Sequence, residues 1–121
     1  DALRRRGIPF GVVSSSWRWY VEHCLRELGM YEDAAVIVTG SDGLPLKPAP
    51  APYQAAARVF RPAPPGAVLA VEDSGSGVRS AVAAGLACAA VYNPDSGAQD
   101  LSPARWRLNS LYELPALLDG N

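Results

Sequence analysis

Short apolar runs alternate along the chain with segments in which apolar residues recur at helical spacing. The runs of strand length occupy residues 8–13, 35–39, 67–71 and 87–91, and a weaker run lies near residues 105–108. Between two strands of a parallel sheet the chain must cross back through a helix, so this alternation is typical of a sheet with helices on its faces. The pattern therefore predicts an α/β fold.

The helical segments show their apolar residues on one face. Val21, Cys24, Leu25 and Leu28 follow the i, i+3, i+4, i+7 pattern and stop at Gly29, a typical carboxy-terminal cap. Two later segments have the same kind of face, made of Tyr53, Ala56, Ala57 and Phe60 in one and of Val78, Ala81, Val82 and Gly85 in the other. A short helix is expected over residues 111–118, and the first residues resemble the end of a helix.

Composition adds mainly exclusions to this picture. The 121 residues, 49% of them hydrophobic, are enough for one domain with one core, so residues 1–121 are expected to form a single domain. The net charge of −1 gives no reason to expect a nucleic acid or a membrane surface as partner. The longest apolar stretch, residues 81–92, is shorter than the roughly 18 residues of a membrane-spanning helix. No signal peptide is recognisable, and a cytoplasmic protein is expected.

The residues that often bind zinc or act as nucleophiles offer little here. Cys24 and Cys88 are far apart and lack CxxC spacing, which argues against a zinc site or a redox pair and favours two buried thiols. The sole histidine, His23, lies one position from the apolar face of its helix and is expected at the surface. A Ser-His-Asp hydrolase is therefore not favoured.

A loop of three serines follows the first expected strand. In an open parallel sheet, ligands bind beyond the carboxyl ends of the strands. Ser14, Ser15 and Ser16 lie between the strand at residues 8–13 and a helix, where hydroxyls, backbone N–H groups and the helix dipole converge. The loop is interpreted as a phosphate cradle, and the alternative is a plain amino-terminal cap.

Lys47 is the only lysine of the chain and lies in the sequence Leu46-Lys47-Pro48-Ala49-Pro50. The prolines stiffen its backbone, so the side chain can present a fixed positive charge to an anion. The alternative interpretation is a surface lysine in a proline-rich loop.

An acidic pair follows the strand at residues 67–71, in the sequence Glu72-Asp73-Ser74-Gly75-Ser76-Gly77. Two adjacent carboxylates repel each other unless a positive group lies between them, and Mg²⁺ takes oxygen ligands of this kind. Glu72 and Asp73 are therefore candidate metal ligands, and a helix cap is the alternative.

In order and spacing, these three segments resemble three active-site motifs of the haloacid dehalogenase (HAD) superfamily, in the branch of β-phosphoglucomutase and phosphoglycolate phosphatase. The motifs are a strand followed by serine, Lys-Pro-x-Pro, and a strand followed by Glu-Asp-Ser-x-x-Gly; the last is the most specific and runs from Val71 to Gly85. The resemblance implies a Rossmann-like three-layer core with a parallel sheet. It also implies a Mg²⁺-dependent phosphohydrolase that acts on a small phosphorylated metabolite through an aspartyl-phosphate.

Roles follow from the resemblance position by position. Ser14 would hydrogen-bond a phosphoryl oxygen, and Ser15 and Ser16 would line the same pocket. Lys47 would bridge the nucleophile and the phosphoryl group, and Asp73 with Glu72 would hold Mg²⁺ directly or through water. Where relatives commonly have aspartate after Lys-Pro-x-Pro, this chain has Ala51.

The family's first motif, a strand that ends in Asp-x-Asp, is not found. None of the seven aspartates has another aspartate two positions later, so the nucleophile is expected in a segment outside these residues. No segment is long enough for the family's cap domain either. In the family, the strand that ends in Asp-x-Asp lies in the middle of the sheet. The chain alone is therefore predicted to be an amino-terminally truncated, carboxy-terminal part of the core that is marginally stable and inactive until the amino-terminal segment completes the sheet.

Other functions remain open on the sequence. A β-phosphoglucomutase-type phosphoryl transfer would use the same motifs. A nucleotide-binding module is suggested by Gly75-Ser76-Gly77 after a strand, although the acidic pair would repel a pyrophosphate. A non-catalytic remnant or a receiver-like domain is the remaining alternative, and a receiver would have only Asp73 as phospho-acceptor.

Overall fold

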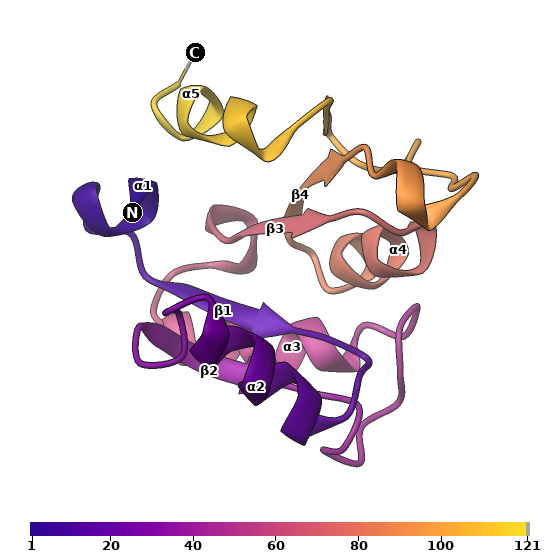
Figure 1. Ribbon diagram of the computed structural model, residues 1–121. Helices are drawn as coiled ribbons and strands as arrows, with labels where there is room; N and C mark the ends of the chain where they lie inside the picture. Colours follow the sequence, from indigo (N-terminus) through magenta and orange to yellow (C-terminus); the bar gives the residue numbers. More distant parts are fainter. Residues whose placement is uncertain (121) are drawn as a thin grey trace.

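The computed structural model describes residues 1–120 and contains five parallel strands and five α-helices (Figure 1). The strands are β1 (Phe10–Val13), β2 (Ala34–Val38), β3 (Leu69–Glu72), β4 (Ala87–Val91) and β5 (Trp106–Leu108). The helices are α1 (Ala2–Arg5), α2 (Arg18–Glu27), α3 (Ala51–Ala57), α4 (Gly75–Ala83) and α5 (Leu114–Leu118). A 3₁₀ turn, Arg58–Phe60, extends α3, and another, Leu111–Glu113, leads into α5.

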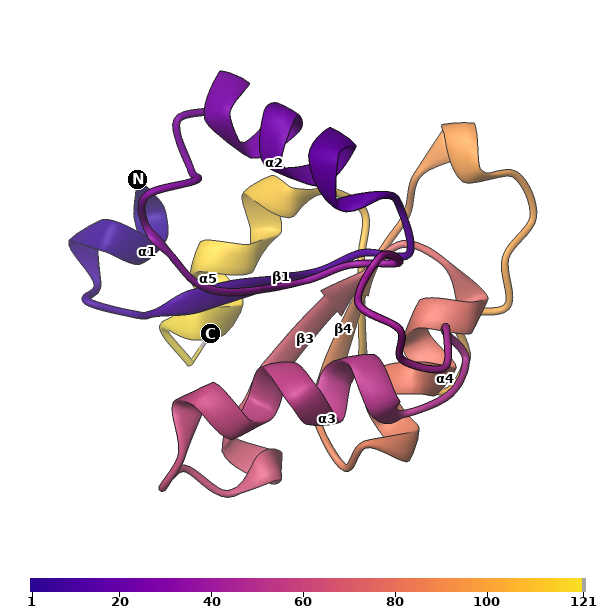
Figure 2. The same cartoon turned by 90° about the horizontal axis from the view of Figure 1, so that it is seen from below.

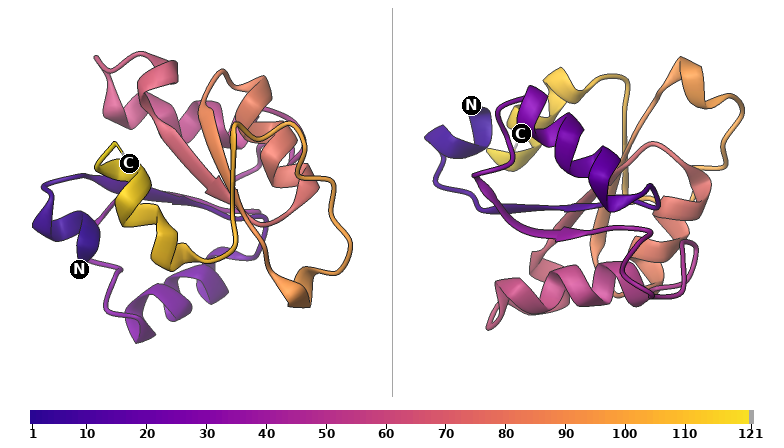
Figure 3. Two further views of the ribbon diagram at one scale, coloured as in Figure 1. Left: turned by 90° about the horizontal axis from the view of Figure 1, so that it is seen from above. Right: turned by 60° about the horizontal axis from the view of Figure 1, so that its bottom comes forward.

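The helices lie in two layers with the strands between them. Figure 2 and the right-hand view of Figure 3 show α2 above β1 and β2 and α3 below them, and the view in Figure 3 shows α1 and α5 on the same side as α2. Helix α4 packs beside α3. This is the three-layer, Rossmann-like α/β arrangement that the sequence predicts. Residues after α1 and α5 are joined, because the Arg6 guanidinium donates to both carboxylate oxygens of Asp119, at 2.8 and 2.7 Å.

The strands form two separate parallel sheets, β1-β2 and β3-β4-β5. Within residues 1–120, the facing edges of β1 and β3 have no strand hydrogen-bonded to them. The resemblance places an additional strand at this position. The arrangement of the two sheets therefore agrees with the expected order of the strands.

The hydrophobic core lies mainly between β3-β4 and the lower helices. Its buried members are Tyr53, Ala70, Val78, Ala81, Leu86, Cys88, Ala90 and Ala104. Small residues dominate this core, and β4 is buried as parallel strands usually are, with Cys88, Ala89 and Ala90 exposed by 1% or less. The upper layer contributes Val21 and Leu25 of α2, which are 6% exposed.

Three residues expected on apolar helix faces are exposed instead: Leu28, Val82 and Gly85, which lies beyond the end of α4. Leu28 is 69% exposed because α2 ends before it, and Val82 is 42% exposed because α4 turns a different side to the sheet. Ser80 occupies that side and is fully buried. Its hydroxyl donates to the Ala49 carbonyl at 2.6 Å, so a polar residue is satisfied where the pattern favours an apolar one.

The remaining expectations about single residues are mostly confirmed. Both cysteines are free; Cys88 is buried, whereas Cys24 is only partly so. Burial, with the charge of Glu72, raises the pKa of the Cys88 thiol to about 11. His23 is exposed. Among residues 1–120, no helix has the length and apolar character required to cross a membrane.

Candidate phosphate and metal site

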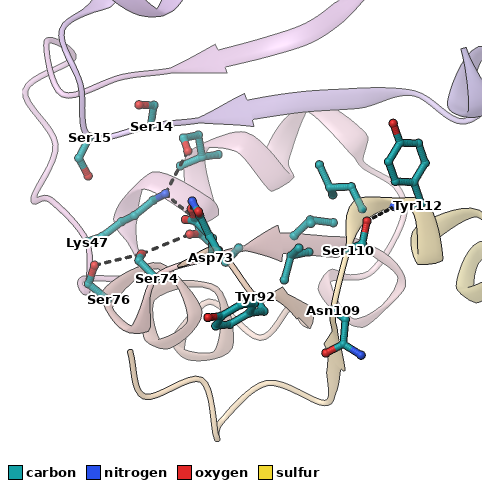
Figure 4. Close-up of a pocket in the computed structure, with 16 residues that line it drawn as sticks. Ser14, Ser15, Lys47, Asp73, Ser74, Ser76, Tyr92, Asn109, Ser110 and Tyr112 are labelled. Carbon is teal, nitrogen blue, oxygen red and sulfur yellow. Dashed lines mark hydrogen bonds and ion pairs between the residues drawn. The ribbon is translucent and has the colours of Figure 1, made fainter. Parts of the chain in front are cut away.

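A cavity of about 840 Å³ opens at the carboxyl ends of β1, β3 and β4 (Figure 4). Five of the six candidate residues line it: Ser14, Ser15, Lys47, Glu72 and Asp73. Ser16 departs from the expectation, because it is exposed and is not among the lining residues. Its carbonyl instead accepts a hydrogen bond from the Gly40 N–H at 2.8 Å.

The serine loop is fixed to the end of β1 and to the loop after β2. The Ser14 N–H donates to the Val38 carbonyl at 2.9 Å, and the Ser14 hydroxyl accepts from the Ser16 N–H at 3.1 Å. The loop at Gly40 packs so closely that a Cβ there would lie 2.2 Å from the Ser15 carbonyl oxygen. Backbone contacts therefore position the loop, and the Ser14 and Ser15 side chains are left at the cavity.

Asp42 holds the neighbouring loop and the start of α2 together. Its carboxylate accepts from the Thr39 N–H at 2.9 Å and the Thr39 hydroxyl at 3.0 Å. It also pairs with the Arg18 guanidinium at 3.0 Å. Burial acts to raise the pKa of Asp42, but the hydrogen bonds from Thr39 and Arg18 outweigh it and hold that pKa below its usual value. Sequence reasoning missed this pair because Arg18 begins α2, whereas Asp42 lies 24 residues later in the loop after β2.

The Lys47 side chain connects the two sheets. Its ammonium group donates to the Val13 carbonyl at the end of β1, at 3.0 Å, and to Glu72 Oε2 at the end of β3, at 2.6 Å. The side chain is only 10% exposed, and its Nζ lies 5.3 Å from the centre of the Tyr53 ring. Lys47 is therefore a fixed, buried charge rather than a mobile surface lysine.

The side chains of Glu72 and Asp73 have different surroundings, because successive side chains along a strand point to opposite faces of the sheet. Glu72 is 8% exposed, and its Oε2 accepts hydrogen bonds from both Lys47 and the Tyr53 hydroxyl. α4 begins directly against it: a Cβ on Gly77 would lie 1.9 Å from Glu72 Oε1. The Glu72 carboxylate is thus surrounded by protein groups.

Asp73 has more freedom to bind a ligand. Asn93 Nδ2 and the Ser96 hydroxyl donate to its Oδ2, at 2.8 and 3.2 Å. From residues 1–120, no hydrogen bond reaches Asp73 Oδ1, which leaves an oxygen of the cavity wall to accept a cation. The Ser74 hydroxyl, which accepts from the Gly77 N–H at 3.1 Å, caps α4 beside it.

These donors fit Mg²⁺ as a partly hydrated ion. Mg²⁺ usually takes one or two protein carboxylates and completes its shell with water and phosphate oxygens. Within the described residues, no group of three or more His, Cys, Asp or Glu side chains forms a complete cage. Of the two carboxylates, Asp73 would be the direct ligand, because its Oδ1 accepts no hydrogen bond from residues 1–120, and Glu72 would act through water.

A comparison with protein families decides the relationship. The model of the haloacid dehalogenase-like hydrolases matches residues 1–85 of the chain. The chain belongs to this family.

Two curated relatives are similar over most of the chain. YhcW of Bacillus subtilis (strain 168), which carries a provisional phosphatase name, is 35% identical over 98% of this chain and 54% of its own length. Validoxylamine A 7'-phosphate phosphatase of Streptomyces hygroscopicus subsp. limoneus is 31% identical over 86% of this chain and 53% of its own length. The chain therefore spans about half the length of the curated HAD relatives that it matches.

Solved structures of HAD proteins share the fold. CbbY from Rhodobacter sphaeroides, solved with phosphate and with xylulose-(1,5)bisphosphate, is 31% identical with a TM-score of 0.84. The match covers 93% of this chain and 51% of that one. A HAD phosphatase from Thermococcus onnurineus is 28% identical with a TM-score of 0.80, over 99% of this chain and 54% of that one.

The sequence analysis did not predict that Asn93, Ser96 and Tyr53 donate hydrogen bonds to the candidate carboxylates Asp73 and Glu72. Asn93 and Ser96 follow β4 at the same sheet edge, so the rule that found the serine loop would also have indicated them. Tyr53 gave no such signal, because its spacing assigned it to the apolar face of α3. Its ring does lie in the core, and only its hydroxyl reaches the site.

Proposed function

We propose that these residues form the phosphate- and metal-binding part of a Mg²⁺-dependent phosphohydrolase that cleaves a phosphate monoester of a small metabolite. The observation that carries the proposal is the convergence of a serine hydroxyl, a buried ammonium group and a carboxylate in one cavity. Three loops contribute these groups, which are Ser14, Lys47 and Asp73, and all three residues line one cavity at the carboxyl ends of β1 and β3. The phosphatase names of the two relatives, and the phosphorylated sugar bound by CbbY, support this substrate class.

Each side chain has a separate task in the proposed reaction. The Ser14 hydroxyl donates to an oxygen of the transferring phosphoryl group. Lys47 offsets negative charge as it develops between the attacking and phosphoryl oxygens, and Glu72 holds the ammonium in place. Asp73 would hold Mg²⁺, with Glu72 acting through water, and bound Mg²⁺ supplies charge neutralisation to the phosphate oxygens.

The nucleophile is proposed to come from a segment outside these residues. That segment would be a strand ending in Asp-x-Asp that pairs with the facing edges of β1 and β3, and its first carboxylate would form the aspartyl-phosphate. Lys47 lies at the carboxyl end of this gap, next to Val13. A carboxylate at the end of the added strand would therefore meet the ammonium group.

The test measures release of inorganic phosphate from a panel of phosphate monoesters, with and without Mg²⁺. The protein that carries this chain together with an Asp-x-Asp strand is expected to turn over, whereas the 121-residue chain alone is not. Ser14→Ala, Lys47→Met and Asp73→Asn should each lower kcat/KM by about 100-fold or more. Asp119→Asn, which removes a carboxylate at the other end of the molecule, serves as the matched control for Asp73→Asn and should leave kcat/KM unchanged.

Two results would contradict the proposal. One is phosphate release that does not depend on Mg²⁺ or on Asp73. The other is binding of inorganic phosphate by the completed protein without turnover of any ester, which would favour a non-catalytic remnant. Conversion of a sugar 1-phosphate to its 6-phosphate without net release would instead indicate phosphoryl transfer between positions of one substrate.

A further inference from the structure

Tyr53 contacts the candidate site from below without lining its cavity. Its side chain belongs to the hydrophobic core and is 7% exposed. The hydroxyl nevertheless donates to Glu72 Oε2, the same oxygen that accepts from Lys47 Nζ at 2.6 Å. Tyr53 can therefore influence the cavity only through Glu72 and Lys47.

We propose that Tyr53 is a positioning residue of this site, whose buried hydroxyl fixes the Glu72 carboxylate and, through it, the place of the Lys47 ammonium at the cavity. The proposal rests on the function proposed above, because it gives Tyr53 a part in presenting Lys47 to a phosphoryl group. It also predicts how firmly the Lys47 ammonium group is held, which can be measured without an activity assay.

The surroundings of Glu72 leave the carboxylate little freedom once the hydroxyl is present. On one side, the closeness of Gly77 leaves no space for the carboxylate to rotate toward α4. On the other side, the tyrosine hydroxyl and the ammonium group converge on a single oxygen. A buried carboxylate with two donors on one oxygen is held both in distance and in direction.

The donor in this contact is the Tyr53 hydroxyl, and the acceptor is Glu72 Oε2. Lys47, in turn, has the Tyr53 ring beneath it, so ring and hydroxyl act on the same ammonium group by different routes.

Tyr53→Phe separates the hydroxyl from the ring. The phenylalanine ring keeps the core packing and the contact with the ammonium group, whereas the bond to Glu72 is lost. A hydroxyl that only satisfies a polar group in the core would affect stability alone. A positioning hydroxyl also changes how Lys47 is held.

Lys47 can be observed directly because the chain has no other lysine. Labelling the 121-residue chain with ¹⁵N-lysine gives a single side-chain ammonium signal, whose hydrogens exchange slowly with water while they are donated to Val13 and Glu72. In Tyr53→Phe, we expect exchange to become about tenfold faster. In Tyr31→Phe, whose ring lies over Arg26 and away from the site, exchange should match the parent chain.

Two results would overturn the inference: equal exchange rates in Tyr53→Phe and the parent, or equal acceleration in both tyrosine variants. In the completed phosphohydrolase, Tyr53→Phe is also expected to lower kcat/KM by about tenfold. A fully active Tyr53→Phe enzyme would contradict the positioning role and leave the proposed function intact. A completed protein without activity would contradict the proposed function, and the exchange measurement would still decide the role of Tyr53.

Discussion

The two sheets of this HAD chain differ in how they are held. In β4, the side chains Cys88, Ala89 and Ala90 are exposed by 1% or less, so the three-stranded sheet is held by close packing on both faces. In β2, only Val38 is buried. The two-stranded sheet is held more by polar contacts, namely Lys47 with Val13 and the Asp42 network with Thr39 and Arg18.

The two sheets therefore contribute differently to stability and to the candidate site. The packed sheet provides Glu72 and Asp73 from a rigid base, whereas the lightly buried sheet provides the serine loop. Catalytic positions on loops require a scaffold that fixes them. Here the scaffold of the serine loop is a set of hydrogen bonds, which single substitutions can remove one at a time.

Among substitutions that test the difference between the two sheets, Lys47→Met is expected to lower the free energy of unfolding most. The substitution removes one contact that links the sheets and leaves the buried Glu72 carboxylate without its cation, which should lower the free energy of unfolding by about 3 kcal/mol. Urea unfolding followed by tryptophan fluorescence measures it. Arg26→Met is the control, because the Arg26–Glu22 pair is at the surface and should contribute less than about 1 kcal/mol. Equal losses in both variants would show that Lys47 does not join the sheets.

A smaller effect tests the packing of the two sheets directly. Val78 is 0% exposed beneath the three-stranded sheet and Val21 is 6% exposed beside the two-stranded one. We expect Val78→Ala to cost about 2 kcal/mol and Val21→Ala about 1 kcal/mol, since the cavity left at Val78 is enclosed on more sides. The same urea experiment gives both values. A larger cost at Val21 would reverse the comparison.

The smallest effect is the acid dependence of the two-stranded sheet. The pKa of Asp42 is lower in the folded than in the unfolded chain, so its contribution to stability is complete above the unfolded pKa of about 3.9 and disappears as the pH falls through the folded value. Below pH 4, the stability of the parent should therefore fall more steeply than that of Asp42→Asn. Arg18→Met should also reduce this slope. Parallel stability curves for the parent and Asp42→Asn would contradict the prediction.

The sequence predicted most of the fold because apolar runs and helical faces are local signals. All five expected strands are present, although β1 begins at Phe10 instead of Ile8 and β3 is shifted toward Glu72. Leu28 and Val82 were misplaced because periodicity does not reveal where a helix ends or which side meets the sheet. The order of the two sheets followed only from the resemblance, since strand pairing is a long-range property.

Site residues that directly follow strands could be predicted from the sequence. Site residues in other positions, such as Tyr53 within a helix, could not. Ser14, Lys47 and Asp73 each lie in a loop at the sheet edge, and the cavity brings them together. Glu72 and Asp73 are adjacent in the sequence, which does not show that their surroundings differ. Tyr53 was hidden by its own hydrophobic spacing, because one side chain fills the core and also donates a hydrogen bond.

Gly77 carries no functional group, yet it determines which sequences the site can accept. Any side chain at this position would meet the Glu72 carboxylate. In a saturation-mutagenesis library scored for phosphatase activity, position 77 should tolerate as few residue types as position 72. Its intolerance would reflect the volume that Glu72 occupies, so a map of essential positions would include a residue that never touches substrate.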